Sequence, residues 1–204
     1  MSNALARKKK RMQPFGYSKS ELIGIQKYAK AQSNAEYLIE ESYYNVRMMA
    51  YQALHDKFEF DQKRIIKVEQ TIDAYVENAK DGTTGEELGF YLKDKCKIDV
   101  REETNKIPYR ESFYLVERKI APNCMIQANK FLLAQVFNYF AMLGVCLKTQ
   151  FKFSANQIRQ VHERIRYLIN CLATGYETMA GIASVLEWEC KYMDQRFIGK
   201  TYEI

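Results

Sequence analysis

The most constraining feature of this sequence is an internal repeat, because the chain matches itself at an offset of 93 residues. Phe58-Glu-Phe60-Asp61 aligns with Phe151-Lys-Phe153-Ser154, and further along one inserted residue raises the offset to 94. The other matching pairs are mostly apolar or glycine: Ala35/Ala128, Asn45/Asn138, Met49/Met142, Leu54/Leu147, Ile65/Ile158, Val68/Val161, Ile72/Ile165, Gly82/Gly175, Leu92/Leu186 and Cys96/Cys190. Charges differ freely between the copies, so the repeat predicts duplicated packing rather than a duplicated catalytic site.

Each copy has the periodicity of helices. A first helix is expected at about 34–56 and, in the second copy, at about 123–149. The second helices carry apolar residues at alternating spacings of three and four, at Ile65, Val68, Ile72, Tyr75 and Ala79 and at Ile158, Val161, Ile165, Leu168 and Leu172. Ser154 and Gln157 form a capping-box pattern, and Gly82 and Gly175 are expected to end these helices. Nine glycines and three prolines exclude a turn-rich all-β chain, so the fold should be an all-α, pseudo-twofold helical bundle.

The same patterns divide the chain into four segments. They are a flexible basic arm (1–17), an extra N-terminal helix (18–33, helical over about 19–31), a first repeat unit (34–121) and a second repeat unit (122–204), with one core shared by the units. Third helices are expected at about 84–96 and 176–193. Between the units, Lys97–Pro108 should be a loop, or a strand at 98–101, before a short helix at about 111–119. Helices 19–31 and 34–56 are either separate or continuous.

One stretch has the composition of a membrane helix. Phe131–Leu147 is uncharged for 17 residues, which is the lower limit for crossing a bilayer. Its copy carries Glu40, Glu41 and Arg47, and such charges are costly in lipid. Two copies of one helix should lie in the same environment. We therefore expect Phe131–Leu147 to be a helix buried in the protein core, without membrane contact.

The cysteines and the N-terminus predict a compartment. Five cysteines without a CxxC pair indicate reduced thiols. No apolar stretch follows the basic cluster near the N-terminus, so no secretory signal is expected. The predicted location is the cytoplasm.

No motif predicts catalysis. Residues 161–164 begin like a zinc-protease helix at His162-Glu163, but Arg166 stands where the second histidine ligand is required. Gly82-Thr-Thr-Gly85 lacks the spacing and the lysine of a phosphate-binding loop, and no nucleophile motif occurs. We therefore expect a protein that is not an enzyme and that holds no metal and no cofactor.

A basic cluster near the N-terminus is the first candidate functional site. It consists of Arg7, Lys8, Lys9, Lys10 and Arg11. The whole chain has a net charge of +6, but outside residues 1–17 it has 26 basic and 25 acidic side chains. Binding of DNA or RNA phosphates would therefore depend on this arm. The alternative is a disordered, solubilising tail.

Tyrosines on the first helix are the second candidate. Tyr37, Tyr44 and Tyr51 recur every seven residues, away from the apolar face, and an aromatic stripe with polar tips suits a protein interface or base stacking. The alternative is that the extra helix 19–31 covers them. Asn45 and Asn138, together with the two Phe-x-Phe turns, are expected to be structural, as a buried polar residue with aromatic wedges at a helix corner.

The block Leu54-His55-Asp-Lys-Phe58-Glu59-Phe60-Asp61-Gln-Lys-Arg64-Ile65 resembles a pattern in small helical proteins of phages and mobile elements of Gram-positive bacteria. There the pattern is Leu-His-x-x-Phe-Gly-Phe-Gly-x-x-Arg-Leu, so Glu59 and Asp61 replace its glycines. The second copy keeps only the phenylalanines and the apolar positions. The resemblance covers about a dozen residues per copy. It implies an accessory protein of a phage or mobile element and transfers no site residue.

These features lead to one leading hypothesis and two alternatives. The leading hypothesis is a non-catalytic, phage-derived interaction protein that binds and occludes a protein or nucleoprotein target in the host cytoplasm. Phage proteins of this size include stoichiometric inhibitors of host defence systems, which need no active site. The alternatives are a nucleic-acid-binding accessory protein that uses the N-terminal arm, and a structural or packaging component of a virion. Formation of a homo-oligomer is left open.

Overall fold

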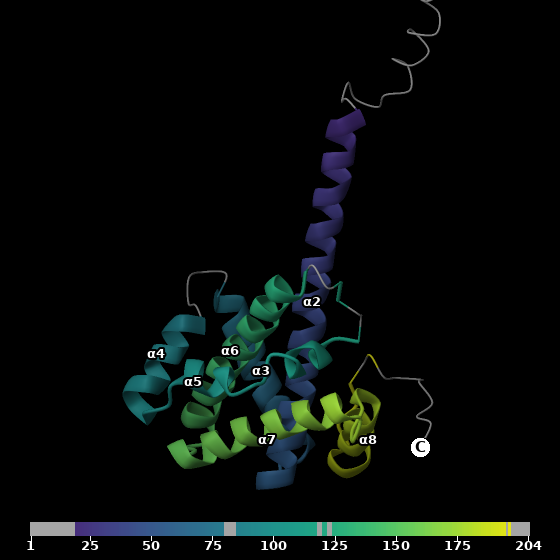
Figure 1. Cartoon of the computed structure of the whole chain (residues 1–204). Helices are drawn as coiled ribbons and strands as arrows, with labels where there is room; N and C mark the ends of the chain where they lie inside the picture. The colour runs from purple at the N-terminus through teal and green to yellow at the C-terminus, as the bar shows by residue number, and fades with distance from the viewer. Residues whose placement is uncertain (1–18, 80–84, 118–119, 122–123, 195, 197–204) are drawn as a thin grey trace, which may run out of the picture. The chain divides into compact units, whose positions relative to one another are not determined.

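The computed structural model describes residues 19–79, 85–117, 120–121, 124–194 and 196 of the chain (Figure 1). The chain divides into two units, residues 1–37 and residues 38–204, and each is described by itself. The regular structure of the described residues is helical, which confirms the predicted all-α class. In chain order the helices are α2 (Lys19–Phe58), α3 (Gln62–Ala79), α4 (Gly85–Cys96), α5 (Val100–Asn105), the 3₁₀ helix η2 (Glu111–Leu115), α6 (Met125–Gln150), α7 (Ala155–Thr174) and α8 (Met179–Cys190).

Helix α2 is continuous, so the predicted boundary between residues 33 and 34 does not interrupt it. No glycine or proline occurs between residues 25 and 58, and nothing in that stretch therefore stops the helix. Within the unit formed by residues 38–204, α2 buries Val46, Met49 and Leu54 in the core. Of the two alternatives, the structure has the continuous helix.

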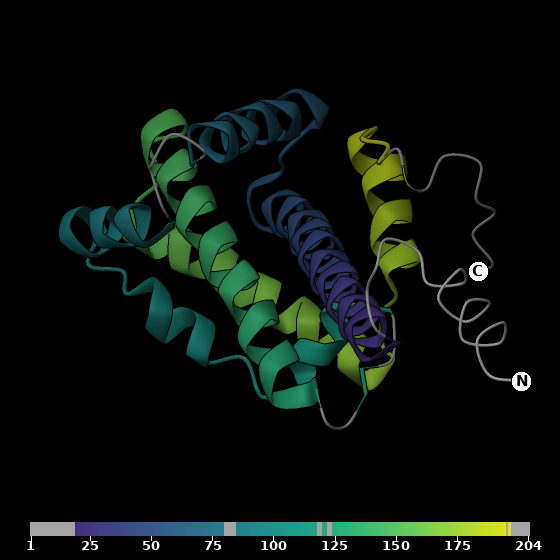
Figure 2. The same ribbon diagram turned by 90° about the horizontal axis from the view of Figure 1, so that it is seen from above.

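Helix α6 is the centre of the unit formed by residues 38–204. It packs against α3, α4, α5, α7 and η2, and Figure 2 shows α4 and α3 on its two sides. Residues 139–147 are all buried, as expected for a core helix. By length and composition alone, α6 is the one helix of the described residues that could cross a membrane, and 61% of its most apolar stretch is buried inside the structure.

Most of the regularly spaced apolar residues of the second helices, α3 and α7, are buried, as predicted. On α3, Ile65, Val68 and Ile72 are buried. On α7 the corresponding buried residues are Ile158, Val161, Ile165 and Leu168. Helix α7 starts with the predicted capping box at Ser154 and ends at Gly175, whose φ of 72° is the left-handed conformation that glycine adopts easily. Gly82 lies outside the described residues.

Four of the described helices end in the same kind of turn. The residue after the turn is buried, and its amide donates to the carbonyl of a leucine six residues earlier: Phe60 to Leu54, Ile98 to Leu92, Phe153 to Leu147 and Tyr192 to Leu186. The residue before it has positive φ in every case: Glu59 (53°), Lys97 (54°), Lys152 (58°) and Lys191 (57°). These are Schellman-type ends in which a non-glycine residue takes the left-handed position.

The segment between the repeats differs from the prediction. Residues 100–105 form helix α5 instead of a loop or strand, because the Asp99 carboxylate accepts hydrogen bonds from the amides of Arg101 and Glu102 and so caps the helix. The helix expected at 111–119 is the short η2 over residues 111–115, and Arg118 and Lys119 lie outside the described residues. Helix α8 begins at Met179 rather than 176, because Thr178 is its N-cap.

The two Phe-x-Phe turns pack against each other. The ring of Phe58 lies 4.7 Å from that of Phe153, and the ring of Phe60 lies 5.0 Å from that of Phe151. Arg64 holds the first turn, since its Nη1 donates to the Phe58 carbonyl and its guanidinium lies 3.7 Å from the centre of the Phe60 ring. The aromatic wedge predicted at a helix corner is therefore present.

Candidate functional site

The predicted nucleic-acid site, Arg7 to Arg11, lies outside the described residues. The expectation for the arm therefore stays a prediction.

The three stripe tyrosines have different surroundings. Tyr37 belongs to the unit of residues 1–37 and is 36% exposed, and Tyr44 is 37% exposed. Tyr51 has no exposed surface, and its ring packs edge-on against Tyr192 at 5.2 Å. Tyr51 is a core residue, because the turn after α8 brings Tyr192 over it. The sequence stripe thus does not present three tyrosines to solvent.

Tyr44 lines a cleft, which we call the tyrosine cleft. Its volume is about 340 Å³, and four helices form its walls. Its lining residues are Ile39, Glu40, Tyr43 and Tyr44 of α2, Tyr75 and Val76 of α3, Gly85 and Leu88 of α4, and Gln135, Asn138 and Met142 of α6. The walls are thus mostly apolar and aromatic, as is typical of binding pockets.

Two carboxamides interrupt the apolar wall that α6 contributes. Gln135 and Asn138 lie three residues apart, on one face of the helix, and both are partly exposed. Neither side chain has a hydrogen-bond partner among the described residues. At Gly85 a Cβ atom would collide with the Oδ1 of Asn138, so glycine allows α4 to approach α6 closely. The cleft therefore offers donors and acceptors within an apolar surface.

A polar cluster lies next to Tyr43 and Tyr44 of the cleft wall. The Arg47 guanidinium forms an ion pair with Glu69, and the Tyr192 hydroxyl donates to the same carboxylate at 3.1 Å. The Tyr43 ring packs edge-on against Tyr139 at 5.4 Å. Burial raises the pKa of Tyr43 to about 12, so its hydroxyl is neutral at physiological pH. The hydroxyls of Tyr43, Tyr51 and Tyr139 are buried without a hydrogen-bond partner in the described part of the chain.

Cations position the ring of Tyr44. The guanidinium carbon of Arg196 lies 4.2 Å from the ring centre and that of Arg47 lies 5.4 Å from it. Beside Tyr44, the Asn45 amide donates to the Leu115 carbonyl at 2.9 Å and links α2 to η2. Asn45 is buried, as predicted, whereas Asn138 is partly exposed in the cleft.

His162 is a core residue rather than a surface group. Its ring is fully buried and stacks on Phe140 at 4.2 Å, with an angle of 3° between the two planes. Both ring nitrogens are without a hydrogen-bond partner in the described part of the chain. Burial lowers the pKa of His162 to about 4, so the ring is neutral near pH 7. Among the described residues, no three of His, Cys, Asp or Glu lie together in a way that could hold a metal ion.

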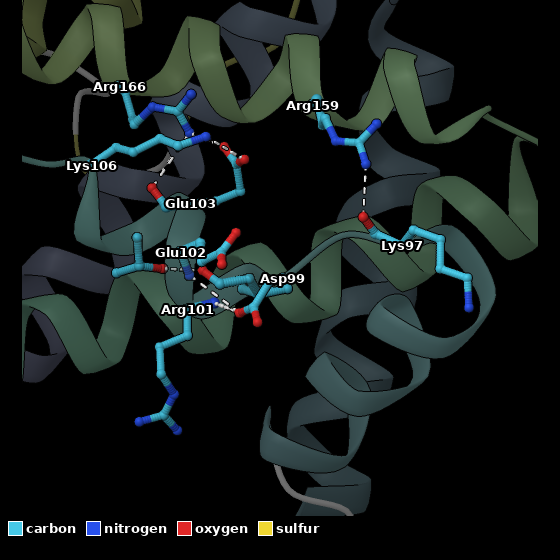
Figure 3. A network of polar contacts seen from close by, with 10 residues as sticks. Lys97, Asp99, Arg101, Glu102, Glu103, Lys106, Arg159 and Arg166 are labelled. Atoms are coloured by element: carbon cyan, nitrogen blue, oxygen red, sulfur yellow. Dashed lines mark hydrogen bonds and ion pairs between the residues drawn. The ribbon is translucent and has the colours of Figure 1, made fainter.

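A polar network joins α5 to α7 (Figure 3). Arg166 donates to the Glu103 carboxylate at 2.5 Å, and Lys106 donates to the other oxygen of Glu103 at 2.7 Å. At the other end of the network, Arg159 donates to the Lys97 carbonyl at 2.7 Å. Because both partners of each contact belong to the protein, this network holds the α5 segment in place and offers no open site.

Comparison with protein-family models, with curated proteins and with solved structures found no match to this chain. The cleft is therefore judged by its own chemistry.

Most residues of the cleft were missed by the sequence analysis. The sequence pattern predicts Tyr75 on the apolar face of its helix and Asn138 as a buried residue at a helix corner, whereas both residues line the cleft. A usable signal was present in α6, where Gln135 and Asn138 are polar residues on one face of a 17-residue uncharged stretch. Polar residues that interrupt an apolar helix at a spacing of three indicate a side of the helix that faces solvent. In the structure this side of α6 forms one wall of the cleft.

Proposed function

We propose that this chain is a non-catalytic interaction protein and that the tyrosine cleft is its docking site for a protein target. The observation that carries the proposal is the cleft itself, in which partly exposed tyrosines surround two carboxamides that have no partner among the described residues. Tyrosine gives a large, rigid contact area with a polar tip and is enriched at interfaces. Burial lowers the pKa of His162 to about 4 and raises the pKa of Tyr139, so both side chains are neutral, which suits a packing role rather than acid–base catalysis.

The scaffold behind the cleft is proposed to be a duplicated unit with pseudo-twofold packing. The contact between Phe58 and Phe153 corresponds, at an offset of 93, to the contact between Phe151 and Phe60. Two contacts that are exchanged by the relation between the copies are characteristic of a twofold axis. The four equivalent helix ends at Leu54, Leu92, Leu147 and Leu186 support the same relation.

A phage accessory role, as an inhibitor that occludes a host defence protein, is the biological setting we propose. It depends on the resemblance around Phe58 and Phe60. The pattern has glycine at the position of Glu59, whose φ is 53°, and glycine suits that conformation. A stoichiometric inhibitor needs a docking surface and no active site, which agrees with the cleft.

Photo-crosslinking tests the docking site. A photoreactive amino acid replaces Tyr44 in one variant and Tyr176, which is 88% exposed in the turn between α7 and α8, in a matched control. Only the Tyr44 variant should crosslink one stoichiometric protein in the host cytoplasm. Tyr44→Ala should weaken co-purification of that protein at least tenfold, while Tyr176→Ala leaves it unchanged. Equal crosslinking at both positions, or equal co-purification of Tyr44→Ala and wild type, rejects the cleft as the docking site.

Nucleic-acid binding through Arg7–Arg11 is the alternative, carried by five consecutive cations. It predicts binding of duplex DNA or RNA whose affinity falls steeply with salt and is lost when residues 1–16 are deleted. Binding that survives this deletion rejects a role for the arm.

A further inference from the structure

The charges on α3 are sorted along the helix. Along α3, Lys63, Arg64 and Lys67 come first, and Glu69, Asp73 and Glu77 follow them. This order opposes the helix dipole, which favours acidic side chains near the start of a helix and basic ones near its end. Helix stability therefore does not explain the order. The acidic part of α3 is the part that contributes Tyr75 and Val76 to the tyrosine cleft.

The edge of the cleft is acidic on two helices. Glu40 of α2 lines the cleft directly and is exposed. On α3, the Asp73 carboxylate is 54% exposed, and its charge contributes to the raised pKa of Tyr43 in the cleft wall. Glu77 is exposed and follows the lining residue Val76. The nearby cations are paired with other carboxylates: Arg47 pairs with Glu69 and, at 3.7 Å, with Asp73, and Arg196 pairs with Asp194 at 3.2 Å. Among the described residues, Glu40 and Glu77 are therefore not part of an ion pair.

We infer that the tyrosine cleft binds a segment of a partner protein in which an apolar anchor side chain is flanked by lysine or arginine. The inference rests on the proposed function and names the partner's chemistry. Apolar walls of Ile39, Val76 and Leu88 accept the anchor, and the volume of about 340 Å³ is at the small end of ligand pockets. Gln135 and Asn138 can pair with the amide and carbonyl groups of the segment's backbone. The acidic edge attracts the lysine or arginine side chains of the partner segment.

The same charges disfavour nucleic acid at this cleft. Stacking of bases on Tyr75 would bring phosphates toward Glu40 and Asp73, and phosphate binding requires cations rather than carboxylates. The two guanidinium groups beside Tyr44, those of Arg47 and Arg196, already pair with Glu69 and Asp194. Any binding of DNA or RNA is thus expected elsewhere on the chain.

A random peptide library, selected against the full chain, tests the inference. Binding of the enriched peptides is then measured by fluorescence anisotropy at low and high salt. Val76→Trp, which fills the cleft at a 38% exposed position, should weaken binding at least tenfold. Glu40→Lys should weaken it about three- to fivefold at low salt and less at high salt. Glu163→Lys, which makes the same charge change at an exposed position of α7, should leave it unchanged.

The outcomes separate this inference from the proposed function. Cleft-dependent peptides with an apolar residue between lysines or arginines support both. Cleft-dependent peptides with neutral or acidic flanks, or an unchanged affinity of Glu40→Lys, overturn the inference and leave the docking site standing. If no enriched peptide is sensitive to Val76→Trp, both are overturned. Binding of labelled single-stranded DNA that Tyr44→Ala weakens overturns the protein partner in favour of nucleic acid.

Discussion

The ring of Phe60 in the first Phe-x-Phe turn packs at 5.0 Å against the ring of Phe151 in the second, so residues 91 positions apart close the same corner of the core. Phe60 is fully buried, and its truncation leaves a cavity beside the rings of Phe151 and Phe153. Phe60→Ala should lower the free energy of unfolding by about 3–4 kcal/mol. Urea denaturation of both single variants and of Phe60→Ala/Phe151→Ala should give a coupling energy of about 0.5–1.5 kcal/mol. Strict additivity contradicts a direct contact.

Replacing a non-glycine residue at one of the left-handed helix ends by glycine should stabilise the protein. Glu59 has a φ of 53°, and a side chain in this conformation is strained by about 1 kcal/mol, whereas glycine is not. Glu59→Gly should therefore raise the free energy of unfolding by about 0.5–1 kcal/mol, measured by urea denaturation. As the converse control, Gly175→Ala, at a φ of 72°, should lower it by about 1 kcal/mol. A destabilised Glu59→Gly variant shows that the Glu59 side chain contributes a contact that outweighs the strain.

His162 predicts acid sensitivity. Burial lowers its pKa in the folded state to about 4, whereas the unfolded chain binds the same proton near the ordinary value of 6.5. Stability contributed by the neutral ring is therefore fully present above pH 6.5 and is lost as the pH falls toward 4. The loss should be about 3 kcal/mol across this window. Urea denaturation of wild type and His162→Phe between pH 7 and pH 4 measures it. A pH dependence that is identical in the two proteins contradicts the assignment.

The buried pair of Arg47 and Glu69 predicts a strong effect of removing one partner. Glu69→Ala leaves the Arg47 side chain, which is only 12% exposed, with the more distant Asp73 carboxylate at 3.7 Å as its remaining ion-pair partner, and it also removes the acceptor of the Tyr192 hydroxyl. The free energy of unfolding should fall by about 2–3 kcal/mol. The control is Asp94→Ala, which removes a pair with Lys95 in which both side chains are at least 60% exposed, and it should leave the free energy of unfolding unchanged within the error of the measurement. Equal effects of the two substitutions in thermal denaturation contradict a buried role for Arg47.

Helix positions were predictable because they depend on local patterns. The seam of Ile158, Val161 and Ile165 and the capping box at Ser154 are short-range signals, and the structure has both. Helix α5 was missed because it is only six residues long and polar on its surface, so its main signal is the cap that Asp99 provides. A single capping residue is weaker than a periodic apolar face.

The candidate site was harder to predict because it depends on which elements meet. Tyr44 and Tyr51 are equivalent in the sequence stripe, and only the return of the chain after α8 buries Tyr51 and leaves Tyr44 exposed. Likewise, Gln135 and Asn138 could be recognised as polar interruptions of α6, but their meeting with Tyr75 and Leu88 requires the packing of α3 and α4 on α6. Long-range contacts of this kind are not encoded in the periodicity of one segment.

The position of Tyr192 has a consequence for synthesis on the ribosome. Helix α2 is made before its partner, because the residue that covers Tyr51 and binds Glu69 follows Glu69 by 123 positions. Until then, the middle of α2 has an uncovered aromatic surface and a charge pair open to water. This folding step must therefore follow the synthesis of Tyr192, and the middle of α2 is more exposed to chaperones and proteases before Tyr192 emerges.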